Sequence, residues 1–148
     1  MTDIVTIYSD GSFRRPNCGA YTFHMTWNGI TLIAYEGVFD TTINRMELSA
    51  VIEALEMLIR PCTVNIFSDS QYVVNTIAKR WIHAWKARGW KTASGDPVKN
   101  QDLMERLYEQ LAIHTINATW VKGHSNVPEN ELCDSIAQGI TQQMLNGR

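Results

Sequence analysis

Four acidic residues stand beside apolar segments and could together bind divalent cations: Asp10, Glu47, Asp69 and Asp134. Carboxylates that converge without partners repel one another and raise each other's pKa values, so a site that keeps them together commonly holds a hard cation. Two such ions about 3.5–4 Å apart can stabilise both the attacking and the leaving oxygen of a phosphodiester displacement. If the fold brings the four acids together, they predict metal-dependent hydrolysis of phosphodiesters.

Each acid also has a purely structural explanation. Asp10 before a glycine suits a tight turn, Glu47 could complete a helix capping box opened by Asn44, and Asp69 could cap the helix that follows it. Glu129 and Glu131 could complement the positive N-terminal end of the last helix. The motifs taken singly leave both interpretations open, so the relative placement of the acids decides between them.

A histidine lies in the loop before the helix that carries Asp134. His124 stands among glycine and small polar residues, so its ring could swing toward the acids and transfer protons near neutral pH. A histidine alone in a polar loop is more often simply solvated. The neighbouring acids favour the catalytic interpretation.

The N-terminal part of the chain has the alternation typical of β-strands. Apolar and polar residues alternate most clearly over 21–27, and Asn28-Gly29 then suits the left-handed positions of a type I′ turn. We therefore expect three strands over residues 4–8, 21–27 and 32–39, of which the second and third form an antiparallel hairpin.

From residue 45 onward the pattern alternates between helices and strands. Helices are expected over 45–59, from 70 onward, near 79–88, near 102–112 and over 128–144, and strands over 64–67 and 116–121. Because strand, helix and strand in succession favour parallel pairing, we expect an α/β fold in which parallel strands extend the antiparallel ones. The crevice of such a sheet lies beyond the carboxyl ends of its strands, where Asp10 and Asp69 would both lie.

The composition fits one globular domain spanning residues 1–148, with 45% apolar and 19% charged residues. No apolar run approaches the roughly 18 residues of a membrane span, and Met1-Thr2-Asp3 lacks the features of a secretion signal. The three cysteines share no spacing typical of a metal site. We expect a soluble cytoplasmic protein, and the net charge of −2 argues against indiscriminate binding of polyanions.

One segment departs from this mildly acidic average. Between residues 79 and 99, six basic residues accompany a single acid, Asp96, and tryptophans are interleaved with them. Such a segment suits sequence-independent contacts with nucleic acid phosphates, whose strength falls as salt rises. Trp81 and Trp85 are spaced four residues apart on a helix, so their partial packing into the core remains an alternative.

Seven short segments, residues 8–12, 44–48, 68–73, 81–92, 97–100, 120–124 and 129–134, occur in an order that resembles ribonuclease H of the bacterial type 1 class. The resemblance implies the ribonuclease H-like fold, with a five-stranded mixed sheet flanked by helices. It also implies two Mg²⁺ or Mn²⁺ ions and a monomer that hydrolyses the RNA strand of RNA–DNA hybrids, leaving 5′-phosphate and 3′-hydroxyl ends. Recognition of 2′-hydroxyls would distinguish the cleaved RNA strand from DNA.

Carried over position by position, the resemblance implies roles for individual side chains. The catalytic set comprises the metal ligands Asp10, Glu47, Asp69 and Asp134, the proton-transferring or product-releasing His124, and the supporting acid Glu131. Contacts with the hybrid fall to Thr42, Asn44, Gln71, Trp81, Trp85, Lys86, Arg88, Trp90, Lys91 and Asn100.

The chain departs from the family pattern at three places. The loop 13–19 is not glycine-rich, Met104 replaces a common aromatic residue, and Asp40 and Ile43 replace a basic residue and an asparagine. Asp40 would repel a phosphate, so Thr42 would anchor that strand alone and the affinity for the hybrid would be lower.

Two other functions fit parts of the pattern. A DNA-directed nuclease of the same fold would share the clustered acids, but it is not expected to have both the tryptophan-rich basic segment and the Lys122-Gly123-His124 loop. A catalytically silent hybrid-binding module would tolerate the loss of a ligand, whereas all four acids and the histidine are present.

Overall fold

The computed structural model describes residues 3–147, within which the strands form one sheet with the order β3-β2-β1-β4-β5. The strands are β1 (Asp3–Arg14), β2 (Cys18–Trp27), β3 (Ile30–Phe39), β4 (Cys62–Ser68) and β5 (Thr115–Trp120). The first three pair antiparallel, whereas β4 pairs parallel with β1 and β5 pairs parallel with β4. This topology confirms the predicted mixed five-stranded sheet.

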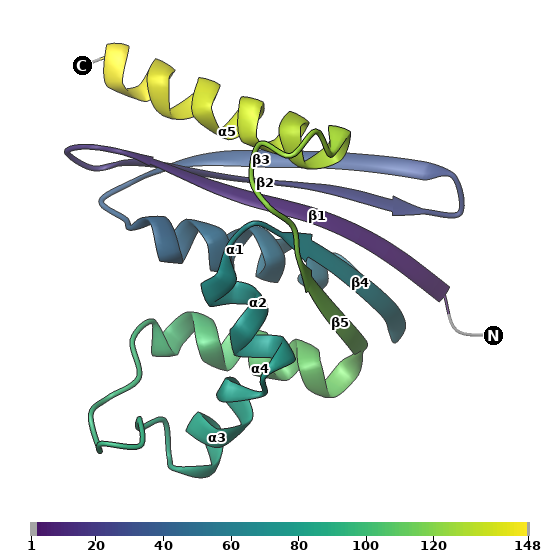
Figure 1. Cartoon of the computed structure of the whole chain (residues 1–148), viewed down its shortest axis with the longest axis vertical. Coiled ribbons are helices and arrows are strands. Elements are labelled where there is room, and N and C mark those ends of the chain that lie inside the picture. The colour runs from purple at the N-terminus through teal and green to yellow at the C-terminus, as the bar shows by residue number, and fades with distance from the viewer. Residues whose placement is uncertain (1–2, 148) are drawn as a thin grey trace.

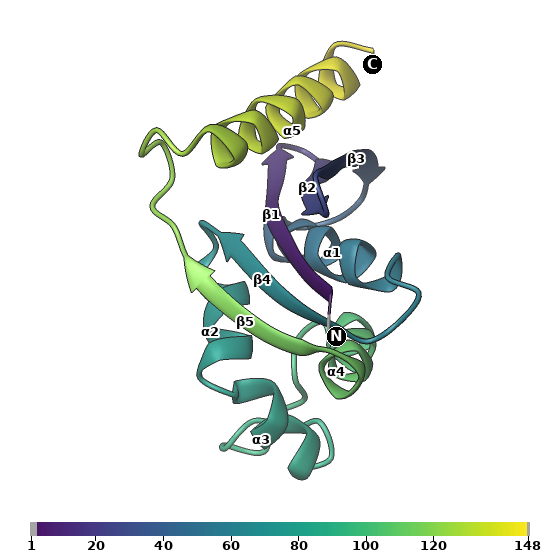
Figure 2. The same ribbon diagram turned by 90° about the vertical axis from the view of Figure 1, so that its right-hand side faces the viewer.

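Helices cover both faces of this sheet. Within the described residues they are α1 (Ile43–Glu56), α2 (Gln71–Ala78), α3 (Trp81–Ala87), α4 (Gln101–Ile113) and α5 (Pro128–Asn146). Figure 1 shows α5 along β1, β2 and β3 on one face, while α1, α2 and α4 pack on the other. The short α3 and the loop after it project beyond this second layer, at the end of the molecule away from α5 (Figure 2).

The core lies between the sheet and the helices on the α1 side, because the alternating strand residues point there. Ile7 of β1 and Phe23 of β2 are buried against the apolar stripe of α1, which includes Leu48 and Leu55. Asn28 and Gly29 have φ angles of 50° and 75°, the left-handed values that a type I′ turn requires. The predicted hairpin between β2 and β3 is therefore confirmed.

Two predicted boundaries are wrong. The sequence predicts that the first strand ends at Tyr8, but β1 continues to Arg14 because its later residues stay paired with β2 as far as Cys18. The first helix ends at Glu56, three residues earlier than expected. Ile59, which was expected within the helix over 45–59, is consequently 94% exposed.

Among the described residues, no helix combines the length and the apolar character that crossing a membrane requires. Met1 and Thr2, on which the expectation about a secretion signal partly rests, lie outside residues 3–147.

Candidate active site

Three of the four predicted acids meet at one point of the fold. Asp10 lies on β1, Glu47 on α1 and Asp69 directly after β4, and one carboxylate oxygen of each lies within 4.8 Å of the others. The parallel pairing of β1 and β4 ends at Ser9 and Ser68, so the next residue of each strand is an acid of this cluster. Strand pairing, rather than the end of β1, brings Asp10 and Asp69 together.

Gly11 holds two of these acids in place. Its backbone N–H donates to Oδ1 of Asp10 and to Oε1 of Glu47, at 3.0 Å in each case. A Cβ at this position would lie 2.7 Å from the backbone nitrogen of Glu47 and 2.9 Å from the carbonyl carbon of Met46. The expected tight turn at Asp10 is wrong, since the glycine serves instead to let α1 approach an extended strand.

The structure also removes the capping explanations for Glu47 and Asp69. Thr42 is the N-cap of α1 and Ser70 is the N-cap of α2, and each side-chain oxygen accepts from the backbone N–H three residues later. The capping box expected from Asn44 is therefore wrong. Neither Glu47 nor Asp69 is needed to begin a helix, so helix capping does not explain why the acids converge.

The electrostatics of the cluster favour a bound cation. Burial raises the pKa of Asp10 and of Glu47, the neighbouring carboxylates raise both further, and burial likewise raises the pKa of Asp69. Within residues 3–147, Oδ2 of Asp10 and Oε2 of Glu47 are buried without a hydrogen-bond partner. Buried charges of one sign are costly unless they are compensated, and a hard divalent cation would compensate several carboxylates at once. The donor set thus fits Mg²⁺ or Mn²⁺.

The fourth acid and the histidine lie at the edge of this cluster. Asp134 of α5 is not part of the group of three, but its charge contributes to the raised pKa values of Asp10, Glu47 and Asp69. The His124 side chain is 78% exposed, and its Nδ1 lies 4.0 Å from Oδ2 of Asp134. The position of His124 is thus compatible with proton exchange between the site and solvent.

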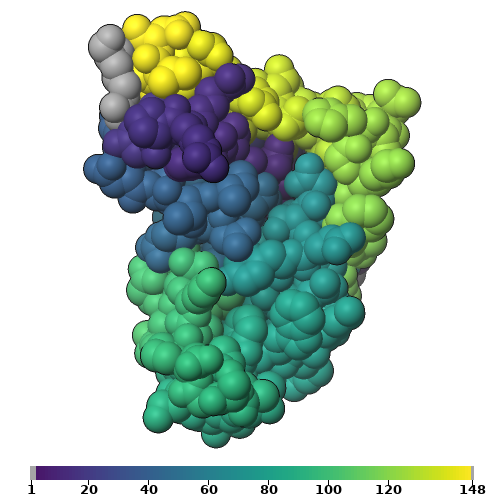
Figure 3. All heavy atoms as spheres, turned by 60° about the vertical axis from the view of Figure 1, so that its left-hand side comes forward, coloured from purple at the N-terminus to yellow at the C-terminus, as the bar shows by residue number. Residues whose placement is uncertain are grey.

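Two further residues lie in the segment that leads into α5 and in its first turn. Gly123 packs so closely that a Cβ there would lie 3.1 Å from Oδ2 of Asp69. Glu131 lies in the first turn of α5, as its structural explanation predicted, and its Oε1 is buried without a hydrogen-bond partner among the described residues. Figure 3 shows atoms of the N-terminal strands recessed between α1 and the segment that leads into α5.

The basic segment forms the projection made by α3 and the following loop. Lys86, Arg88 and Lys91 are exposed there. Trp81 is 39% exposed, and Trp85 is partly buried against the core, so the alternative of partial core packing is realised for Trp85. Between this loop and α2 lies a groove of about 350 Å³ whose lining includes Tyr72, Trp85 and Lys99.

Trp90 differs from the other two tryptophans of the projection. It is only 9% exposed, belongs to the core, and meets the ring of Tyr108 edge to face at 6.1 Å. Its position supports the projection from within and offers little surface to a ligand.

The remaining predicted contact residues surround the acids at the starts of helices. Thr42, Asn44 and Gln71 are exposed at the N-termini of α1 and α2. Asn100 is partly buried at the N-cap of α4. Hydrogen bonds through Arg45 and Tyr72 join Asn100 to the starts of α1 and α2.

The departures from the family pattern have local structural roles. Asp40 accepts a hydrogen bond from Nδ2 of Asn17 at 2.6 Å, and its backbone N–H donates to the carbonyl of Asn17 at 2.9 Å. These contacts tie the loop 13–19 to the residues that lead into α1. Met104 is fully buried in the core.

Sequence reasoning missed the structural importance of two glycines. Gly11 suggests part of a turn and Gly123 only a source of loop mobility, yet both lie against the acids. In the sequence, the only sign of this role was that each glycine lies near a candidate ligand. The close approach itself could not be seen, because the acid that each glycine packs against lies 36 or more residues away in the chain.

The chain is similar to known ribonucleases H in sequence and in fold. The RNase H family profile matches residues 2–142. The ribonuclease H of Oleidesulfovibrio alaskensis is 50% identical over 136 residues, which cover 91% of this chain and 88% of the relative. That of Enterobacter sp. (strain 638) is 50% identical over 146 residues, covering 98% and 94%.

Two solved structures share the fold. The crystal structure of a type 1 RNase H with the type 2 active-site motif has a TM-score of 0.82 at 28% identity, covering 97% of this chain and 74% of that chain. A foamy viral protease-reverse transcriptase in complex with an RNA/DNA hybrid has a TM-score of 0.73 at 15% identity, covering 95% of this chain and 20% of that chain. The matched profile, the sequence relatives and the cluster of acids agree, and the chain belongs to the ribonuclease H family.

Proposed function

We propose that the protein is a monomeric cytoplasmic endonuclease that hydrolyses the RNA strand of RNA–DNA hybrids with two divalent cations, leaving 5′-phosphate and 3′-hydroxyl ends. The observation that carries this proposal is the buried cluster of Asp10, Glu47 and Asp69, in which two carboxylate oxygens have no hydrogen-bond partner within residues 3–147. Family membership then indicates the class of substrate.

The acids would bind the cations, and a backbone N–H would hold two of the acids in place. Asp10, Glu47, Asp69 and Asp134 are the proposed ligands, with Glu131 as a supporting acid. Mg²⁺ or Mn²⁺ bound there would stabilise negative charge on the phosphate and on the displaced oxygen, which is worth several kcal/mol. The N–H of Gly11 donates to one oxygen of Asp10 and one of Glu47, which keeps these two proposed ligands side by side.

In the reaction a water molecule gives up a proton to solvent as its oxygen bonds to phosphorus, the bond from phosphorus to the 3′-oxygen breaks, and the departing 3′-oxygen takes up a proton. His124 is suited to deliver that proton or to exchange it with solvent, since it is exposed and its Nδ1 lies 4.0 Å from Asp134. Only the protonated ring can donate from both nitrogens, so delivery of the proton would leave a neutral imidazole that solvent can recharge.

The hybrid would lie across the acids and along the projection of α3. Thr42, Asn44, Gln71 and Asn100 would contact the strands near the scissile bond. Trp81, Trp85 and Trp90 with Lys86, Arg88 and Lys91 would bind the backbone further along, Trp90 mainly by supporting its neighbours. The foamy viral protease-reverse transcriptase, which shares the fold, has been solved with an RNA/DNA hybrid and with dsDNA, so the choice of a hybrid rests on membership of the ribonuclease H family.

A cleavage assay with three labelled duplexes tests the proposal. We expect the protein to cut the RNA strand of an RNA–DNA hybrid in Mg²⁺ and to leave matched duplex DNA and duplex RNA intact, with no cleavage in EDTA. Product ends that accept a 3′ extension and carry a 5′-phosphate would support the proposed direction of bond breakage. Cleavage of duplex DNA would indicate a DNA-directed nuclease, and binding without cleavage would indicate a silent binding module.

Neutralising the projection should weaken binding and reduce its dependence on salt. In the triple variant Lys86→Gln, Arg88→Gln and Lys91→Gln, we expect hybrid binding to depend less steeply on salt. The plot of the logarithm of the association constant against the logarithm of the salt concentration should have a slope whose magnitude is smaller by about 0.7–0.9 for each phosphate that is no longer neutralised. Filter binding of a hybrid over a salt series measures this slope. Arg60→Gln removes a positive charge near the end of α1 and should leave the slope unchanged. Equal slopes for the triple variant and the unmodified protein would exclude the projection from binding.

A further inference from the structure

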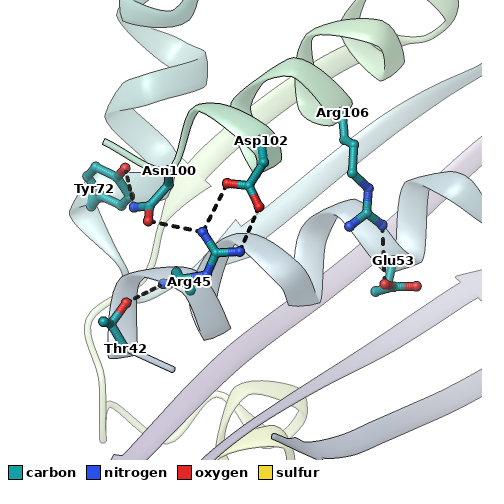
Figure 4. Close-up of polar contacts among 7 residues, drawn as sticks. All are labelled: Thr42, Arg45, Glu53, Tyr72, Asn100, Asp102 and Arg106. Carbon is teal, nitrogen blue, oxygen red and sulfur yellow. Dashed lines mark hydrogen bonds and ion pairs between the residues drawn. The ribbon is translucent and has the colours of Figure 1, made fainter. Parts of the chain in front are cut away.

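Two arginine clamps join α1 to α4 (Figure 4). In the first, Arg45 of α1 donates from Nη2 and Nη1 to the two carboxylate oxygens of Asp102 on α4, at 2.8 and 3.0 Å. In the second, Arg106 of α4 pairs with Glu53 and Glu56 further along α1. Both clamps are partly exposed, so solvent screens them and each is expected to add little to stability.

The first clamp differs from the second because it reaches a residue of the proposed hybrid site. Nη1 of Arg45 also donates to Oδ1 of Asn100 at 3.4 Å, and Nδ2 of Asn100 donates to the hydroxyl of Tyr72 at 3.2 Å. These two hydrogen bonds fix which end of the Asn100 amide points toward α1 and which toward α2. One N–H of that amide is left over for a ligand.

Helix α4 does not itself orient the side chain of Asn100. Asn100 is the N-cap residue of α4, has a φ of 59°, and its side chain makes no capping hydrogen bond to the helix. The side chain is therefore oriented by Arg45 and Tyr72 rather than by α4 itself.

Arg45 also lies among the other proposed contacts on α1. Its backbone N–H donates to Oγ1 of Thr42 at 3.2 Å, it directly follows Asn44, and it precedes Glu47 by two residues. The bidentate pair with Asp102 thus links the turn that presents Thr42 and Asn44 to the residue that presents Asn100. The hydrogen bonds from Arg45 lower the pKa of Asp102 to about 2, so the pair is ionised throughout the neutral range.

We propose that Arg45 and Asp102 are positioning residues for the hybrid: their ion pair holds Asn100 at a fixed distance and orientation relative to Thr42 and Asn44, and so presents these three side chains to the hybrid as one binding surface. This inference rests on the proposed function, because it concerns how the hybrid is held. Neither residue needs to touch the scissile phosphate for this role.

Asp102→Asn gives a test in which positioning and simple electrostatics have opposite signs. Removing a negative charge beside a polyanion site should tighten binding if charge alone matters. If Asp102 positions Asn100 through Arg45, we expect KM for the hybrid to rise about three- to tenfold with kcat changed by less than about twofold. Glu56→Gln is the matched control, since it removes one charge from the second clamp, and its KM should stay at the unmodified value. Thermal unfolding of both variants measures their stability under the same conditions.

A double-mutant cycle separates positioning from a general loosening of the packing between α1 and α4. If Asp102 acts through Asn100, Asn100→Ala should raise KM by itself and Asp102→Asn should add little in the Asn100→Ala background. The inference is overturned if Asp102→Asn leaves KM unchanged or lowers it, if Glu56→Gln raises KM equally, or if the two effects add fully. These outcomes presuppose a cleaving unmodified protein; failure of that protein to cleave the hybrid would reject the proposed function, and the positioning role with it.

Discussion

Replacing Asp10 with asparagine should reduce hybrid cleavage by about a thousandfold or more while leaving the protein folded, since loss of a charged metal ligand removes several kcal/mol of transition-state stabilisation. Asp10 is one of three converging carboxylates, and asparagine nearly preserves its shape. Single-turnover cleavage of a labelled hybrid in saturating Mg²⁺ measures the loss. Glu109→Gln, which neutralises an exposed acid of α4, is the control and should cleave at the unmodified rate.

The same variant should be more stable than the unmodified protein when divalent cations are absent. Burial and the charges of Glu47 and Asp69 raise the pKa of Asp10, so ionised Asp10 destabilises the folded state. Because each unit by which folding raises a carboxyl pKa costs about 1.4 kcal/mol of stability at higher pH, and the pKa of Asp10 rises from 3.8 to about 10, we expect Asp10→Asn to raise the free energy of unfolding at pH 7 by at least about 1.4 kcal/mol. Denaturant unfolding in EDTA measures this difference. A variant that is clearly less stable and still cleaves would return Asp10 to a structural role.

The stabilisation should depend on pH in a defined direction. A carboxyl whose pKa is raised on folding binds its proton more tightly in the folded protein than in the unfolded one. The folded protein therefore loses stability as pH rises above 3.8, the ordinary pKa of an aspartate. Asp10→Asn removes this loss. The stability difference between variant and unmodified protein should therefore be largest at neutral and higher pH and vanish below about pH 4.

The antiparallel part of the fold could be predicted because its signals are local. The alternation over β2 and the pair Asn28-Gly29 are set by side-chain direction and by φ, both of which depend on neighbouring residues alone. The bounds of β1 and α1 could not be predicted in the same way. Whether β1 continues beyond Tyr8 depends on its pairing with β2, and nothing local to Ile59 signals that α1 has already ended.

The part of the site that follows from the sheet topology was predictable. Asp10 and Asp69 come directly after the last paired residues of β1 and β4, so their proximity follows from the parallel pairing of these strands. The burial of Trp90 was not predictable, because it lies after α3 in a loop with no periodicity and its ring is covered by residues such as Tyr108 of α4. The pairing of Arg45 with Asp102 was likewise hidden, since 57 residues separate the partners.

Gly11→Ala should disturb the fold and the site together, because the space that its methyl group needs is occupied by backbone. The new Cβ would lie 2.7 Å from the nitrogen of Glu47 and 2.9 Å from the carbonyl carbon of Met46, and neither atom can rotate away as a side chain could. To accept it, α1 must move away from β1 at the level of Glu47. We expect the free energy of unfolding to fall by about 3 kcal/mol, near the upper range for overpacking.

Moving α1 also displaces a metal ligand, so the same substitution should lower cleavage by about a hundredfold, the effect of a misplacement of about 1 Å at a reacting centre. Gly139→Ala is the matched control: it lies within α5, a Cβ there meets no atom within 4 Å, and alanine favours the helix by about 0.5–1 kcal/mol. We therefore expect Gly139→Ala to be slightly more stable and fully active, and Gly11→Ala to be less stable and poorly active even at temperatures where it remains folded. If Gly11→Ala unfolds and cleaves like the unmodified protein, the close approach of α1 to β1 cannot be what places Glu47 beside Asp10.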